Sequence, residues 1–181
     1  MPLITLSPLL LLITDSLAWL LLHLGISFGL RKVSDAFFER HANWFRSFAF
    51  EKGGRIWADV FRIRQWKDKL PDGTVIAKKG FDKSRLAQQQ KDYLEKFVIE
   101  TRRAELTHWL LMVPAPFFFL WNPAWAGWVM IVYALLANCP FIMIQRYNRP
   151  RLERVLRKKK CPASQAEGDG LGSCRCRFKI R

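Results

Sequence analysis

The chain has 181 residues, half of them hydrophobic, and carries 30 basic against 15 acidic residues, a net charge of +15. This length fits one domain and excludes a chain of several folds. A basic excess is typical of nucleic-acid-binding proteins, but none of these basic residues precedes Arg31, 18 lie between Arg31 and Glu105, and 12 lie from Arg146 to the end. Because the charges flank apolar segments, anionic lipid headgroups account for them, and we expect no nucleic-acid partner.

The first predicted element is a membrane span within residues 1–30, from about Leu9 to Leu30. Basic residues follow its apolar core, whereas in a secretory signal they precede it, so we predict an uncleaved span with its N-terminus outside. Its place at the start of the chain is nonetheless that of a signal sequence. Two polar residues interrupt the span. For Asp15 a hydrated or capping role and a functional role both stay open, and for His23 we favour packing.

Residues 31–106 are predicted to form a cytoplasmic, interfacial helical region. Nine aromatic residues lie between Phe37 and Trp66, with arginines and lysines close by, a composition that suits helices in the headgroup layer. Pro71-Asp72-Gly73 predicts a turn. Apolar residues recurring every three or four positions from Leu86 to Val98 predict a helix that continues into the next span.

Residues 107–145 contain two apolar segments, of about 15 and about 21 residues, which predict a transmembrane hairpin. Trp121-Asn122-Pro123-Ala124-Trp125 predicts its outer turn, and the last span runs from about Ala126 to Ile144. Residues 146–160 follow as a basic juxtamembrane segment and residues 161–181 as a disordered tail. The predicted fold class is an all-α integral membrane protein with about three transmembrane helices. It is multi-pass in the cell membrane, with its basic regions cytoplasmic.

The sequence favours no metal site and no familiar hydrolase motif. Cys139 lies in the last span and three further cysteines lie in the tail, without the spacing of zinc ligands. A Gly-rich phosphate loop, a Gly-x-Ser-x-Gly elbow and a His-Glu-x-x-His pair are all missing from the sequence. A thioester on Cys139 is disfavoured because its sequence neighbours are apolar.

The candidate site lies where the hairpin meets the predicted cytoplasmic face. On a helix Glu105 and His108 share one face, with Arg102 one turn before Glu105. A carboxylate beside an imidazole orients it and raises its basicity, as a general base for a hydroxyl requires. The alternative is a helix end that reaches to the headgroups, with His108 an interfacial residue. The residues alone favour this second interpretation by a small margin.

Four stretches of the sequence then point to one family: FEKGGRIW at residues 50–57, ETRRAELTHW at 100–109, YALLANCP at 133–140 and QRYNRPRL at 145–152. In this order they resemble the glycosyl-4,4'-diaponeurosporenoate acyltransferases, over about residues 31–152. The resemblance implies a membrane enzyme that esterifies the glucose C6 hydroxyl of a carotenoid glycoside with a fatty acyl group. That reaction is the closing step of staphyloxanthin biosynthesis. Better-known acyltransferases carry a His-x4-Asp motif, but here Val113 stands at that spacing from His108.

Acyl transfer needs a base, an oxyanion stabiliser and a group that holds the donor. We predict His108 as the base, Glu105 as the residue that orients it, and Asn138 or Asn148 with Arg146 near the oxyanion. The remaining candidates for binding substrate phosphates are Arg102, Arg103, Arg149 and Arg151. The expected partners are the lipid bilayer, an amphiphilic glycosylated carotenoid or similar glycolipid, and acyl-CoA or acyl carrier protein as donor, with no further cofactor. The rival function is a non-enzymatic membrane scaffold that binds anionic lipid or a partner enzyme.

Overall fold

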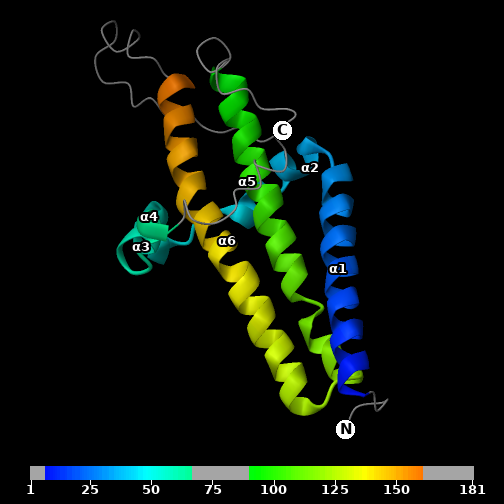
Figure 1. Cartoon of the computed structure of the whole chain (residues 1–181). Helices are drawn as coiled ribbons and strands as arrows, with labels where there is room; N and C mark the ends of the chain where they lie inside the picture. Colours follow the sequence, from blue (N-terminus) through cyan, green and yellow to red (C-terminus); the bar gives the residue numbers. More distant parts are fainter. Residues whose placement is uncertain (1–6, 67–89, 161–181) are drawn as a thin grey trace, which may run out of the picture.

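The structure, a computed structural model, describes residues 7–66 and 90–160, and within these ranges it is helical with no strand. Three long helices lie side by side: α1 (Pro8–Lys32), α5 (Gln90–Met112) and α6 (Ala124–Lys160) (Figure 1). Shorter elements connect them, namely α2 (Asp35–Arg40), η1 (Ala42–Phe45), η2 (Ala49–Gly54), α3 (Arg55–Asp59), α4 (Ile63–Trp66) and η5 (Ala115–Leu120). The predicted turn at residues 71–73, the first turn of the helix predicted from Leu86, and the tail with its three cysteines lie outside the described residues.

Two helices, not three, are long and apolar enough to cross a membrane: α1 and the part of α6 from Ala124 to Arg157. The predicted span at the start of the hairpin is wrong. The α5 helix ends at Met112, and after Pro114 the chain continues as the 3₁₀ helix η5. Proline has no backbone N–H and restricts the residue before it, so the apolar run does not extend as one straight helix. The two apolar helices indicate an all-α protein associated with a membrane.

The α1 helix closely matches the predicted first span. The Oγ of Ser7 accepts a hydrogen bond from the N–H of Leu10 at 3.4 Å, and Pro8 occupies the first turn, where its missing N–H costs nothing. Asp15 is buried, and its Oδ1 accepts hydrogen bonds from Trp121 Nε1 and Asn122 Nδ2, both at 2.8 Å. Of its two open roles, this contact supports a structural one, because it ties α1 to the turn between η5 and α6 that was predicted as the outer turn.

Two apolar clusters hold the long helices together. Near the outer turn, Trp19 stacks on Phe118 with ring centroids 4.8 Å apart. His23 belongs to this packing, as expected, because its Nδ1 lies 2.8 Å from the carbonyl of Trp19 and its ring meets the indole edge-on. Near the other end a second cluster joins α1, the short helices and α5: Leu30, Phe38, Phe45 and Ile99.

The long α6 helix contains Pro140 and Pro150, and it continues without a break through the segment predicted as a separate juxtamembrane stretch. Because Pro150 lacks an N–H, the carbonyl of Arg146 loses its usual helical donor. The backbone of Gly54 packs against this point, so closely that a Cβ there would lie 3.2 Å from the carbonyl oxygen of Arg146 and 3.1 Å from that of Tyr147. With φ +87° at Gly54, only glycine fits this approach without strain.

Between α1 and residue 66 the chain forms short helices, as the composition of this segment predicts. Lys52, Gly53 and Gly54 all have positive φ angles, of 47°, 64° and 87°, and they reverse the chain between η2 and α3. Large aromatic side chains there stay exposed, including Trp44, Phe48, Phe50 and Phe61. This reversal brings the segment against α6 and so positions the site described next.

Candidate active site

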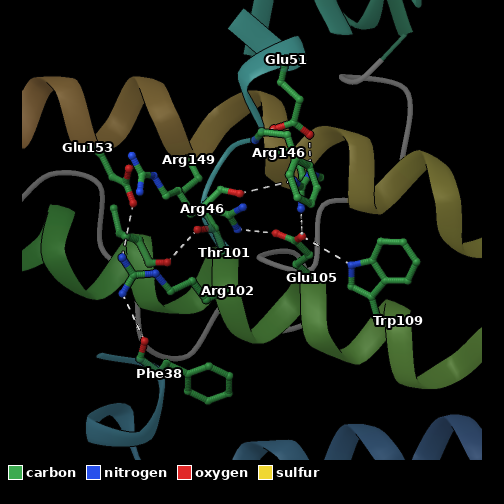
Figure 2. Close-up of polar contacts among 12 residues, drawn as sticks. Phe38, Arg46, Glu51, Thr101, Arg102, Glu105, Trp109, Arg146, Arg149 and Glu153 are labelled. Atoms are coloured by element: carbon green, nitrogen blue, oxygen red, sulfur yellow. Dashed lines mark hydrogen bonds and ion pairs between the residues drawn. The ribbon is translucent and has the colours of Figure 1, made fainter. Parts of the chain in front are cut away.

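Glu105 lies at the centre of a buried cluster of charges between α5, α6 and η2 (Figure 2). Its side chain is 1% exposed. Arg146 Nη1 donates to Glu105 Oε1 at 2.7 Å, and Arg149 Nη1 donates to Oε2. The indole N–H of Trp109, one turn further along α5, approaches Oε1 at 3.4 Å. The carboxylate is therefore fully occupied by donors from two helices.

Glu51 completes this charge cluster from the short-helix region. It is fully buried, and its Oε1 accepts a hydrogen bond from Arg146 Nε at 2.5 Å. Its Oε2 accepts the backbone N–H of Phe48 at 3.0 Å, and the guanidinium of Arg146 lies over the Phe48 ring, 4.7 Å from its centroid. Two carboxylates thus face two guanidiniums, so the cluster is balanced in charge, which buried ions require. Sequence reasoning missed Glu51, although it lies in the first stretch that resembles the family and is an acidic residue in a basic region.

The arginines of α5 are also held by carboxylates. Arg102 Nη2 lies 3.3 Å from Glu153 Oε1, and Nη1 donates to the carbonyl of Phe38 at 3.3 Å. Burial lowers the pKa of the Arg102 guanidinium from its usual value, and Glu153 opposes that shift. Arg103 pairs with Glu100 at 2.7 Å and with Asp35 at 2.5 Å.

This pairing bears on the predicted donor-binding set, which stays a prediction. Arg102, Arg103, Arg146 and Arg149 each have carboxylate partners within the protein, so a substrate phosphate would have to compete with them. Arg149 keeps one spare donor, since its Nη2 is buried without a hydrogen-bond acceptor among the described residues. Asn148 and Arg151 differ, because they line a surface cavity together with Phe97, Leu152 and Val155.

His108 lies one turn beyond the charge cluster and faces Asn138 on α6. Its Nδ1 is 2.9 Å from Asn138 Oδ1, and its ring stacks on Phe141 with centroids 4.7 Å apart and planes 7° apart. Asn138 is buried, and its Nδ2 donates to the carbonyl of Ala134 at 2.8 Å, so its oxygen is the atom that meets the imidazole. An oxygen can only accept, so Nδ1 carries the proton. Nε2 then keeps the lone pair that a general base needs.

The structure therefore corrects the predicted pairing of Glu105 with His108. Both side chains lie on one face of α5, as their spacing predicts, but each contacts a different part of α6. The carboxylate takes the two guanidiniums because an ion pair between full charges is stronger than a hydrogen bond to a neutral ring. Asn138, predicted near the oxyanion, is the residue that hydrogen-bonds the His108 ring.

The structure shows no group of three or more His, Cys, Asp or Glu side chains within residues 7–66 and 90–160 that could hold a metal ion. What these residues offer is a neutral imidazole with one nitrogen fixed and one available, beside a dense set of cations. The fold thus defines a membrane-associated helical protein, and its site holds a histidine bound by a buried amide beside a set of paired cations.

Comparison with known proteins identifies the family. The family model for glycosyl-4,4'-diaponeurosporenoate acyltransferase matches residues 41–158, which include the charge cluster, His108 and Asn138. Relatives of that name from Staphylococcus aureus strains bovine RF122 / ET3-1, USA300 and NCTC 8325 / PS 47 are 39% identical over 142 residues. The match covers 78% of this chain and 86% of each relative. No solved structure matches the chain. The chain belongs to the glycosyl-4,4'-diaponeurosporenoate acyltransferase family and is an acyltransferase.

Proposed function

We propose that this acyltransferase esterifies the glucose C6 hydroxyl of a carotenoid glycoside with a fatty acyl group, as in the last step of staphyloxanthin biosynthesis. The observation that carries the proposal is the match to relatives named for glycosyl-4,4'-diaponeurosporenoate over 86% of their length. Such a substrate is an amphiphile, with a long polyene and a sugar. A protein with two long apolar helices and a polar site between its helices suits that shape.

In this mechanism His108 is the general base. Nε2 takes the proton of the sugar hydroxyl while the hydroxyl oxygen attacks the acyl carbonyl of a thioester, either acyl-CoA or acyl carrier protein. The new C–O bond forms, the C–S bond breaks, and the leaving thiolate receives the proton from the imidazolium. Asn138 keeps the ring in the tautomer that presents Nε2. The buried amide thus acts by orientation, as the partners of catalytic histidines commonly do.

The proposed placement is multi-pass, with the basic regions on the cytoplasmic side of the cell membrane. The basic residues support it, since none precedes Arg31, 18 lie between Arg31 and Glu105, and 12 follow from Arg146 onward. Because α6 begins at the same end of the bundle as α1 (Figure 1), α5 and η5 together would return the chain to that side, although neither is a long apolar helix. The acyl donors named above are cytoplasmic, so the base and the donor would meet on one side.

The test is ester formation by His108→Ala protein. We expect turnover to fall by about 10² to 10⁴-fold, the range for loss of a general base, with membrane insertion retained. His41→Ala is the matched control, because His41 contacts the carbonyl of Phe37 in the short-helix region and has no proposed part in the chemistry. Lipids extracted from cells that make the carotenoid glycoside are quantified by mass spectrometry against protein abundance.

Three results would contradict the proposal. Normal product from well-inserted His108→Ala protein would remove the base assignment. Accumulation of a different acylated glycolipid would show that the acceptor is not the carotenoid glycoside. Binding of lipid or of a partner enzyme, without any ester product from the unchanged chain, would favour a scaffold.

A further inference from the structure

A surface cavity of about 260 Å³ lies beside α6 near its basic end. Asn148, Arg151, Leu152 and Val155 line it from α6, at the spacing of residues that share one helix face, and Phe97 lines it from α5. The cavity is mainly apolar with two polar side chains, an amide and a guanidinium. This is the usual composition of a small-molecule site, where a few polar groups fix the orientation of a ligand.

Arg151 differs in its contacts from the other arginines that were predicted to bind substrate. It is exposed, and among residues 7–66 and 90–160 no carboxylate pairs with it. Its guanidinium lies over the ring of Tyr147, with Cζ 3.9 Å from the centroid. Because a ring face is not a conventional hydrogen-bond acceptor, this contact leaves N–H donors of the guanidinium available. A guanidinium in a cavity without a carboxylate partner is suited to a phosphate, which it can bind through two parallel hydrogen bonds.

We propose that this cavity binds the phosphate end of the acyl donor, a phosphopantetheine thioester in both forms named under the proposed function. The inference rests on the proposed function, and it assigns to Arg151 and Asn148 the donor-binding role. Arg151 takes the phosphate, Asn148 is placed to hydrogen-bond an amide of the pantetheine arm, and Phe97 and Val155 contact its apolar part.

The spacing along α6 fits a donor of this class. Arg151 lies about 20 Å further along the helix axis than Asn138, the residue that holds His108, at a rise of about 1.5 Å per residue. In a phosphopantetheine thioester the phosphate and the reacting carbonyl are separated by a long extended arm with two amides. In a phospholipid they are separated by only a few bonds of glycerol. A donor with its phosphate at Arg151 and its carbonyl at His108 is therefore of the extended kind.

The test is binding of coenzyme A to the full-length protein in phosphatidylcholine nanodiscs, measured by calorimetry. Arg151→Gln should weaken binding about tenfold, as expected for loss of a charge-assisted pair of hydrogen bonds, and Arg151→Lys should restore part of the affinity. Val155→Trp keeps every charge but fills the cavity, and it should weaken binding as well. Arg31→Gln is the control, because it removes the same charge from an exposed site at the end of α1 and should not change binding.

A second arm separates a donor phosphate from a lipid headgroup. The same variants are incubated with phosphatidylglycerol vesicles. If Arg151→Gln weakens vesicle binding while coenzyme A binding is absent or unchanged, the cavity is a lipid contact and the proposal is overturned. Equal losses in Arg31→Gln and Arg151→Gln would overturn it too, because binding would then follow overall charge.

The donor-site proposal and the proposed acyl-transfer reaction can fail independently, and the experiments distinguish the two failures. His108→Ala should bind coenzyme A normally, and Arg151→Gln should raise the KM for the acyl donor more than it lowers kcat. Coenzyme A binding that depends on Arg151, in a protein that makes no ester of a carotenoid glycoside, would uphold the donor site and refute the proposed acceptor. Ester formation that does not depend on Arg151 would support the proposed acceptor and refute the donor site.

Discussion

Replacing Glu105 by glutamine should destabilise the protein strongly, and any loss of activity should follow the loss of folded protein. The carboxylate is 1% exposed and accepts hydrogen bonds from Arg146 and Arg149. Without its charge, Arg149, itself 2% exposed, loses its only carboxylate partner among the described residues, whereas Arg146 keeps Glu51. Removing one partner of a buried ion pair leaves an uncompensated charge, at a cost of about 3 to 5 kcal/mol.

Glu100→Gln provides the matched control on the same helix. Glu100 also pairs with an arginine, at 2.7 Å, but its side chain is 39% exposed. Exposed pairs contribute about 0 to 1 kcal/mol, so this variant should unfold close to the unchanged protein. Urea unfolding in detergent micelles, followed by tryptophan fluorescence, measures both changes. The double variant Glu105→Gln with Arg149→Gln should recover part of the loss, because the orphaned cation is then absent.

A Glu105→Gln protein as stable as the Glu100→Gln control would refute this reasoning. If that stable protein also made no ester, Glu105 would return to the part in catalysis that helical spacing alone predicted for it. The two explanations are thus separated by a stability measurement made before any activity assay.

Three further predictions concern the packing and the limits of the site. Gly54→Ala should lower stability and activity, because its Cβ would meet two backbone oxygens at 3.1 and 3.2 Å, whereas Gly25→Ala, with nothing within 4 Å, should change little in the same urea titration. Asp15→Leu should detach α1 from the outer turn and leave two donors without an acceptor, seen as a changed fluorescence of Trp121. Truncation after Lys160 should leave ester formation intact, since the family match ends at residue 158; a well-inserted but inactive truncated protein would contradict this.

Much of the helical architecture could be predicted from hydrophobic runs and turn residues. The limits of α1 follow from the apolar stretch, and the outer turn follows from Asn122-Pro123 between two tryptophans. The second predicted span was wrong because the length and hydropathy of an apolar run do not show where a helix ends. Pro114 converts the apolar run into a short 3₁₀ helix, and the charged residues before it belong to the same amphipathic α5.

The site could be predicted only in part, for a different reason. Helical spacing correctly placed Glu105 and His108 on one face, but it says nothing about which residues of another helix will face them. The cationic partners of Glu105 lie on α6, and Glu51, 95 residues earlier in the sequence than Arg146, binds that same arginine. Such a pairing depends on the turn at Gly53-Gly54 and on its contact with α6, and neither leaves a periodic signal.

A net charge of +15 is compatible with a polar site between apolar helices, because the buried arginines of that site are paired with carboxylates. Arg146 and Arg149 are buried, and each is matched by a carboxylate, because an unpaired buried charge would be too costly. A phosphate at Arg149 would find only the buried Nη2 free, and a second hydrogen bond would displace Glu105 and leave a carboxylate unpaired. At exposed Arg151 no such exchange is needed, since its contact is with the ring of Tyr147 and not with a carboxylate. Arg146 and Arg149, which stabilise the fold, are therefore distinct from Arg151, to which we assign the donor phosphate, although all three lie within two turns of α6.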